Sequence, residues 1–153
     1  MRKILFRGKQ TDKDKWIYGV PIKGTSADES EILIIESVFK CDEYACIGCE
    51  FTPIIPSTVG QYTGLTDKNG KKIFEGDIVK ITDRNVCFET MAVIEFGNPN
   101  GLYNWGWQLK PLENKPFAIE ILHWVDMEDS GAFIEVIGNI HDNPELLKGG
   151  EEE

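Results

Sequence analysis

The stretch Val59–Ile81, VGQYTGLTDKNGKKIFEGDIVKI, decides the fold of this chain. It places two short strand-like pieces on either side of Asp67–Gly70, and this turn ends in Asn-Gly, the dipeptide that most readily adopts the positive φ angles of a hairpin turn. After Gly76 and Asp77 comes the largely β-branched run Ile78–Ile81, as at the start of a strand. The stretch therefore predicts a β-hairpin that leads into a further strand.

Short strand signals continue along the whole chain, and helical periodicity is almost absent. The other expected strands are Ile4–Phe6, Trp16–Tyr18, Glu31–Phe39, Val86–Phe96, Tyr103–Leu109, Phe117–Trp124 and Phe133–Ile140. We expect Gly19–Pro21 to end the second of these, and the prolines of Thr52–Pro56 to confine any strand there to a sheet edge. Phe117–Trp124 also suits a short helix, although a strand is favoured. Pro144–Lys148 is expected to form a short terminal helix with Asn143 as its N-cap.

The segment Tyr103–Leu109 has its large apolar residues at every second position, which is the period of one face of a strand. We expect these residues to fill the interior of a barrel. The alternative is that Tyr103, Trp105 and Trp107 are exposed, and that they stack on bases or line a peptide groove. The run of short strands predicts an all-β fold, built as a small barrel or as two packed sheets.

The chain of 153 residues has a formal net charge of −10 and a sequence pI near 4.7, which disfavours a general attraction to nucleic acid or to an anionic membrane. Its charges are unevenly spread, because Met1–Gly24 carries seven Lys or Arg against two Asp. We interpret the basic head and the acidic remainder as parts that attract each other within the fold or between subunits. No apolar run approaches the ~20 residues of a membrane span, and Met1–Arg7 becomes polar too early for a signal peptide, so a cytoplasmic protein without a membrane partner is expected.

Seven motifs follow one another over nearly the whole chain. They are Phe6–Lys9, Trp16–Gly19, Val59–Leu65, Asp67–Lys71, Ile73–Val79, Val136–Ile140 and Asn143–Leu147. Together they resemble the YopX family of bacteriophage and prophage proteins. The resemblance implies a phage-encoded cytoplasmic protein whose carboxy-terminal part is an SH3-like β-barrel. It implies no activity, because the family is one of unknown function, and no catalytic or ligand residue carries over from it.

The expected domain organisation combines this resemblance with the strand pattern. An N-terminal β segment over residues 1–55 packs on an SH3-like β-barrel domain over residues 56–148, which ends in one short helix, and residues 149–153 form a disordered acidic tail. The boundary is placed near residues 52–58 because two prolines fall there.

Two groups of basic residues are candidates for a nucleic-acid interface. They are Lys68, Lys71 and Lys72 on the predicted hairpin, and Arg2, Lys3, Arg7 and Lys9 at the first predicted strand. The alternative is that lysines on hairpins and edge strands prevent other chains from pairing with a sheet edge. We favour this alternative.

The four cysteines are candidates for a metal centre. Cys41, Cys46 and Cys49 follow the spacing C-x4-C-x2-C with Cys87 as a distant fourth, which is the spacing that holds a [2Fe–2S] cluster in plant-type ferredoxins. The same four thiolates also suit a structural zinc ion. We favour reduced, partly buried thiols without a metal, because Cys87 falls within a predicted strand and cytosolic cysteines are usually reduced.

Other ionisable residues give weaker signals. His141 and Asp142 suit an acid–base pair, although a role in a turn is favoured. Asp126, Glu128 and Asp129 supply carboxylates for a divalent cation without the regular spacing of a calcium loop. No phosphate-binding loop, Ser–His–Asp set or zinc-protease signature is present, so we predict no enzymatic activity and no cofactor.

Three functional hypotheses follow. The first is a phage-encoded interaction module that acts through protein partners or self-assembly. The second is a nucleic-acid-binding accessory protein that uses the two basic groups. The third is a zinc or iron–sulfur protein built on the four cysteines.

Overall fold

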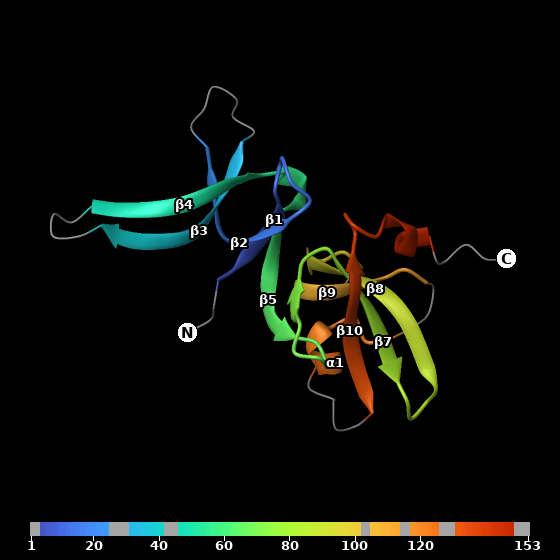
Figure 1. The fold of residues 1–153 in the computed structure, drawn as a ribbon. Helices are drawn as coiled ribbons and strands as arrows, with labels where there is room; N and C mark the ends of the chain where they lie inside the picture. The colour runs from blue at the N-terminus through green and yellow to red at the C-terminus, as the bar shows by residue number, and fades with distance from the viewer. Residues whose placement is uncertain are drawn as a thin grey trace. The chain divides into compact units, whose positions relative to one another are not determined.

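The computed structural model describes residues 4–24, 31–41, 46–101, 105–113, 117–125 and 131–148. The chain divides into two compact units, Met1–Tyr62 and Thr63–Glu153. The described residues form two antiparallel sheets and one short α-helix (Figure 1), which confirms the expected all-β fold. The division between the units lies a few residues after the boundary expected near residues 52–58.

Antiparallel strands build the first unit. They are β1 (Phe6–Lys9), β2 (Trp16–Lys23), β3 (Ile32–Cys41) and β4 (Cys46–Ile54), followed by the 3₁₀ helix η1 (Pro56–Thr58) and by β5 (Gly60–Thr66), which carries the chain into the second unit. The first sheet has the strand order β4-β3-β2-β1-β5-β6. β3 lies where the sequence predicts it.

The bounds of β1 and β2 differ from those expected. β1 runs on to Lys9, and β2 continues through Pro21, where the sequence predicts its end, as far as Lys23. Pro21 is tolerated because β1 pairs with Trp16–Gly19 only, so that beyond this point β3 is the neighbour of β2 among the described strands. The edge position expected for Pro53 is confirmed, because β4 is the outermost strand of the sheet.

The core of the first unit consists of Ile17, Ile34 and Ile54, each at most 2% exposed. One comes from each of β2, β3 and β4, and the burial of each contributes roughly 1.5–3 kcal/mol. Gly19 has to be a glycine, because a Cβ at this position would collide with the backbone carbonyl of Ile35. The close approach of β2 and β3 therefore depends on a residue without a side chain.

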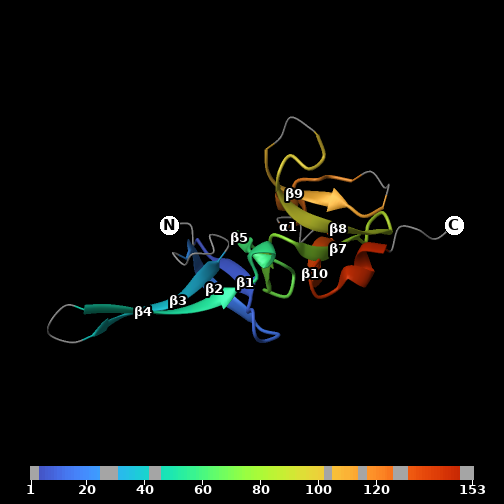
Figure 2. The same ribbon diagram turned by 90° about the horizontal axis from the view of Figure 1, so that it is seen from above.

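The second unit contains the second sheet, with the strand order β10-β7-β8-β9 (Figure 2). Its elements are β6 (Lys72–Phe74), β7 (Asp77–Asp83), β8 (Phe88–Gly97), β9 (Gly106–Pro111), α1 (Ile121–Val125), β10 (Ala132–Asn139) and the 3₁₀ helix η3 (Pro144–Lys148). The predicted hairpin around Asp67–Gly70 is confirmed as β5 and β6, and the further strand as β7. Neither sheet is closed in the described part of the chain, so the expected barrel is not confirmed.

The core of the second unit draws on both of its layers, the sheet and the helix. Its buried members are Ile73, Val79, Ile81, Ala92, Ile94, Leu109, Ile121, Trp124, Ala132, Ile134 and Val136. Leu65, Phe88, Trp107 and Phe117 are among the partly buried side chains packed against it. This core has more buried members than that of the first unit.

The structure has a helix where the sequence favours a strand. In α1, Ile121 and Trp124 are 2% and 5% exposed, and their spacing of three residues places both on the inner side of one helical turn. The indole Nε1 of Trp124 donates to the Ala118 carbonyl at 2.7 Å, which holds the start of the turn. For Phe117–Trp124 the favoured strand is wrong and the alternative of a short helix is correct for its second half.

Of the alternating large residues in Tyr103–Leu109, those that the structure describes fill an interior only in part. β9 begins after Trp105, which is 76% exposed, whereas Trp107 is half-buried and Leu109 is fully buried. The register explains this gradient, because β8 places the buried Ile94 opposite Leu109 and an exposed side chain opposite Trp107. The expectation that these large residues all point inward is therefore wrong.

The terminal helix is confirmed as η3, which starts at Pro144. Asn143 precedes it, and its backbone carbonyl accepts the NH of Leu146 at 3.1 Å. Asn143 therefore occupies the expected N-cap position, and its side-chain Oδ1 accepts the NH of Asn139 at 3.3 Å, at the end of β10. No helix in the described part of the chain is both long and apolar enough to cross a membrane.

Candidate functional site

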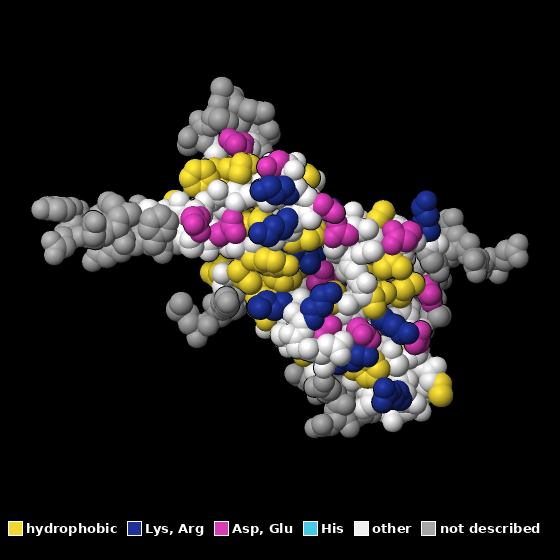
Figure 3. All heavy atoms as spheres, viewed as in Figure 1, with side chains coloured by type: hydrophobic (Ala, Val, Ile, Leu, Met, Phe, Trp, Pro, Cys, Tyr) yellow, Lys and Arg dark blue, Asp and Glu magenta, His cyan; other side chains and the backbone are white. Residues whose placement is uncertain are grey.

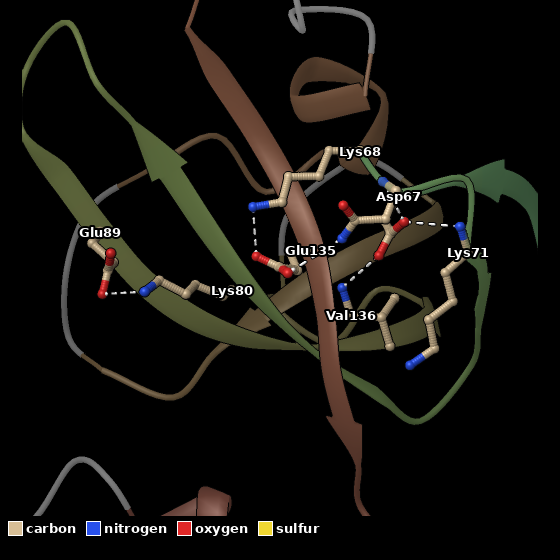
Figure 4. A network of polar contacts seen from close by, with 8 residues as sticks. Asp67, Lys68, Lys71, Lys80, Glu89, Glu135 and Val136 are labelled. Atoms are coloured by element: carbon tan, nitrogen blue, oxygen red, sulfur yellow. Dashed lines mark hydrogen bonds and ion pairs between the residues drawn. The ribbon is translucent and has the colours of Figure 1, made fainter.

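The turn between β5 and β6 is organised by the carboxylate of Asp67 (Figure 4). Its Oδ1 accepts the backbone NH groups of Asn69 and Lys71, both at 2.9 Å. Its Oδ2 accepts the NH of Val136 in β10 at 3.0 Å. Gly70 follows with a φ of 77°, the conformation for which the Asn-Gly dipeptide is suited. Asp67 is only 6% exposed, and its hydrogen bonds hold the turn against β10.

Lys68 is bound within the fold. Its Nζ lies 2.6 Å from Oε2 of Glu135 (Figure 4). The same Nζ lies 4.2 Å from the centre of the Phe133 ring. The hydrogen bond from Lys68 lowers the pKa of Glu135, whereas desolvation of the carboxyl group raises it. The positive charge of Lys68 and a hydrogen bond from Asn69 also lower this pKa. This lysine therefore stabilises the contact between the turn and β10 rather than standing free for a ligand.

Lys71 and Lys72 are exposed on the hairpin, and unlike Lys68 they form no ion pair with the described residues. Two lysines of the neighbouring sheet are paired instead. Lys80 lies 2.8 Å from Glu89, and Lys110 lies 3.0 Å from Glu95. The sequence-predicted basic group of the hairpin is thus reduced to two adjacent side chains.

The basic residues of the first strand are also used within their own unit. Arg7 is 7% exposed, and its guanidinium lies over the ring of Trp16 at 4.7 Å. Lys9 forms an ion pair with Asp14 at 2.6 Å. Arg2 and Lys3 fall outside the described residues. The two basic groups belong to different units, Arg7 and Lys9 to the first and the hairpin lysines to the second.

The cysteines are divided between the units as well. The backbones of Cys41 and Cys46 pair directly at the ends of β3 and β4, and the side chains of these two residues are not described. Cys49 is a free, exposed thiol of β4. Cys87 is a free, exposed thiol in the turn after β7, at a φ of 52°. The expected strand position of Cys87 is wrong, because the strand begins one residue later, at Phe88. The expected partial burial is also wrong for Cys49 and Cys87, because both thiols are exposed.

Groups of three or more His, Cys, Asp or Glu side chains placed to hold a metal are absent from the described residues. The turn role favoured for His141 and Asp142 is confirmed, because both backbone NH groups donate to Oδ1 of Asn139 at 3.0 Å. The carboxylate of Asp142 accepts the side-chain amide of Asn139 at 2.9 Å. The acidic candidates at Asp126–Asp129 lie outside the described ranges, as does Tyr103.

One surface was not singled out by the sequence reasoning. We call it the apolar face, and it consists of Tyr18, Val20 and Ile22 of β2, Leu33 and Ile35 of β3, and Phe51 and Pro53 of β4. The register places Val20, Ile35 and Phe51 in one row across the strands, and Ile22, Leu33 and Pro53 in the next. Paired residues of antiparallel strands project to one side, so this face lies opposite the core isoleucines.

The apolar face is open to solvent in the described structure. Tyr18 is 48% exposed, Val20 49% and Phe51 56%, while Leu33 and Ile35 are half-buried. Figure 3 shows hydrophobic side chains gathered at the surface of this unit. The sequence of Trp16–Lys23 contains a signal for this face, because both alternating sets of positions hold large apolar residues. Such a pattern does not show which of the two sets is covered by the rest of the protein.

Replacing Asp67 with alanine should destabilise the second unit strongly. Three backbone NH groups lose their acceptor, and because only that of Val136 is buried while those of Asn69 and Lys71 are partly buried, we expect the free energy of unfolding to fall by about 1–3 kcal/mol. Asp67→Asn retains one oxygen and should cost less. Urea denaturation followed by tryptophan fluorescence measures both. Asp12→Ala, which removes an exposed carboxylate of the first unit, is the control, and an equal loss in the control would contradict this account.

The Glu135 carboxyl should titrate below its ordinary pKa of 4.5, because Lys68 donates a hydrogen bond to its charged form. Since the folded pKa is the lower one, the pair adds stability above the unfolded pKa, and this stability is lost as the pH falls through the folded pKa. NMR titration of the Glu135 side chain measures the shift. Lys68→Met should return the pKa toward 4.5, whereas Lys80→Met should leave it unchanged. An unaltered titration in Lys68→Met would show the cause to be wrong.

The comparisons with known proteins agree with the motif pattern. The crystal structure of protein EF1440 from Enterococcus faecalis matches with a TM-score of 0.59 and 23% sequence identity, over 97% of this chain and 100% of that chain, and at this identity the likeness shows the fold alone. No curated protein matches the chain. A family model described as YopX protein matches residues 5–148. The chain therefore belongs to the YopX family.

Proposed function

We propose that this protein is a non-enzymatic interaction module that acts through protein partners or self-assembly, and that the apolar face of its first unit is where a second copy docks. The observation that supports the proposal is the exposure of large apolar side chains in two adjacent rows on one side of β2, β3 and β4. Contiguous exposed apolar surface of this kind is uncommon on monomers and usually marks a contact site.

The composition of the apolar face is that of the centre of an interface. Tyr18 and Phe51 are aromatic anchors, the residue type enriched at the energetically important centre of interfaces. None of the members of the face is Lys, Arg, Asp or Glu. Covering such a surface stabilises a complex by about 25 cal/mol for each Å² of apolar area removed from water.

A second copy of the chain suits this face because of its charge. The whole chain carries a net charge of −10, which opposes the association of two copies, so an interface between them should add no like-charge contacts of its own. The apolar face meets this condition. In a two-fold arrangement the row Val20, Ile35 and Phe51 contacts the same row of the other copy, so one patch supplies both sides of the interface.

Self-association should be lost when a charge is placed on the apolar face. Sedimentation equilibrium of the full chain should show a concentration-dependent dimer, and Val20→Glu or Phe51→Glu should weaken it by at least about tenfold, since 1.4 kcal/mol is lost with each factor of ten. Val86→Glu is the matched control, because Val86 is 70% exposed in the second unit. Circular dichroism checks that each variant folds.

A chain that stays monomeric at all accessible concentrations would contradict docking of a second copy. Equal weakening by Val86→Glu and Val20→Glu would do the same, because the effect would then reflect added net charge and not the face. A dimer that is unaffected by Phe51→Glu would place the contact elsewhere.

A second candidate function is nucleic-acid binding at the hairpin. The observation that favours it is the pair of adjacent exposed lysines, Lys71 and Lys72, next to the turn held by Asp67. With Lys68 paired to Glu135, these two side chains would carry the contact with phosphates. The first-strand group of Arg2, Lys3, Arg7 and Lys9 would have to contribute from the other unit.

Charge reversal at the hairpin decides between the two candidates. If the protein binds DNA or RNA, affinity should fall with added salt, and Lys71→Glu with Lys72→Glu should abolish it. Lys13→Glu with Lys15→Glu changes the net charge equally on exposed positions outside the candidate groups, and it is the control. The absence of binding at low salt, measured by fluorescence anisotropy, would remove this candidate.

Further expectations about the protein also belong to the proposal. They are bacteriophage or prophage origin, a cytoplasmic location, an SH3-like arrangement of the second unit, and the absence of catalysis and of a cofactor. A zinc or iron–sulfur centre on the four cysteines is the last alternative, supported by the pairing of Cys41 with Cys46 close to Cys49. Turnover that is lost on mutating one named side chain would contradict the absence of catalysis.

A further inference from the structure

The second unit has a pocket that none of the functions above uses. It has a volume of about 210 Å³ and lies between α1 and the turn that joins β7 to β8. It is lined by Asp83, Val86, Phe88, Phe117, Ala118, His123 and Trp124. The pocket is therefore walled chiefly by aromatic rings, with one carboxylate among them.

Three of these rings form a connected wall. The centres of Phe88 and Trp124 lie 6.4 Å apart, those of Phe88 and Phe117 6.2 Å, and those of Phe117 and Trp124 6.3 Å. Each distance is within the range of favourable aromatic pairs. The hydrogen bond from Trp124 Nε1 to the Ala118 carbonyl fixes the largest ring. The wall is thus formed before any ligand arrives, which lowers the entropic cost of binding.

The charge of the pocket comes from Asp83 at the end of β7. Its Oδ1 accepts the backbone NH of Asn85 at 2.9 Å, which fixes the carboxylate at the head of the turn. Lysine and arginine are absent from the lining residues, and the described part of the chain places no ion pair on Asp83. A carboxylate beside aromatic rings is an arrangement that attracts a cation, because the carboxylate and the faces of the rings present negative potential.

Elsewhere in the chain, aromatic rings are already matched with cations. Phe133 has Lys68 at 4.2 Å and Arg84 at 5.1 Å from its ring centre, and Trp16 has Arg7 at 4.7 Å. The three rings of the pocket have no such lysine or arginine among the described residues. The pocket therefore offers the same chemistry to a cation from outside the chain.

We infer that this pocket binds an alkylammonium group, either a methylated or free lysine side chain of another protein or a small quaternary amine. The methyl groups of such a cation pack against Phe88, Phe117 and Trp124, and its charge faces Asp83. The inference is independent of self-association, because the apolar face belongs to the other unit.

The test compares choline with its uncharged isostere 3,3-dimethylbutan-1-ol at constant ionic strength. The indole NH of Trp124 is the NMR probe. We expect a saturable shift with choline and with tetramethylammonium, and at least about fivefold weaker binding of the neutral alcohol, since a cation over aromatic rings gains about 1 kcal/mol. A peptide containing one trimethyl-lysine distinguishes the sources: tighter binding than choline identifies a protein side chain, and equal binding a small amine.

Two variants test the dependence of binding on the charge of the pocket. Asp83→Asn retains an oxygen for the Asn85 NH and removes the charge, so binding of choline should fall to the level of the neutral alcohol, whereas Glu145→Gln should change nothing. Val86→Lys places an ammonium group of the chain itself at the rim and should weaken choline binding, and its wild-type residue is exposed enough for the fold to tolerate it.

Three results would overturn the inference. They are no saturable shift of the Trp124 indole NH up to about 100 mM choline, equal binding of choline and the neutral alcohol, and unchanged choline binding in Asp83→Asn. The second result would mean that the pocket accepts apolar groups without regard to charge.

Discussion

The hydrogen bonds accepted by the Asp67 carboxylate are the constraint on which the second unit depends. They join Asn69 and Lys71, which are close in sequence, to Val136, which is 69 residues away. A short turn alone fixes only its own strands, whereas this carboxylate also fixes the turn against β10. Because Asp67 is buried, the bonds are made in a low-dielectric setting where an unpaired NH is costly.

Several of the candidate basic residues are engaged in contacts within the chain. Lys68 pairs with Glu135 and lies over Phe133, while Arg7 and Lys9 are engaged within the first unit. Of the described basic residues in the two candidate groups, only Lys71 and Lys72 form no ion pair or ring contact with the described residues, so these groups offer little free basic surface. This favours uncharged and cation-accepting contact sites over sites for an anion.

The two proposed contact sites arise from the same property of β-strands. Each strand presents two faces, and one layer of core covers only one of them. In the first unit Ile17 and Ile34 are covered, while Val20 and Ile22 are not. In the second unit the aromatic pocket forms where Phe88, at the margin of the core, meets α1.

The sequence by itself determined the local features: the Asn-Gly hairpin, the edge position of Pro53, the start of η3 and the all-β class, because each depends on backbone preferences of neighbouring residues. Only the tertiary structure decided which side of an alternating strand is buried, as the gradient from exposed Trp105 to buried Leu109 demonstrates. An alternating pattern indicates that a strand has two different faces. The residues that cover one of these faces come from distant parts of the chain. For the same reason the sequence offered Lys68 only as a candidate for a nucleic-acid interface, whereas Glu135, brought to it by β10, makes it part of the fold.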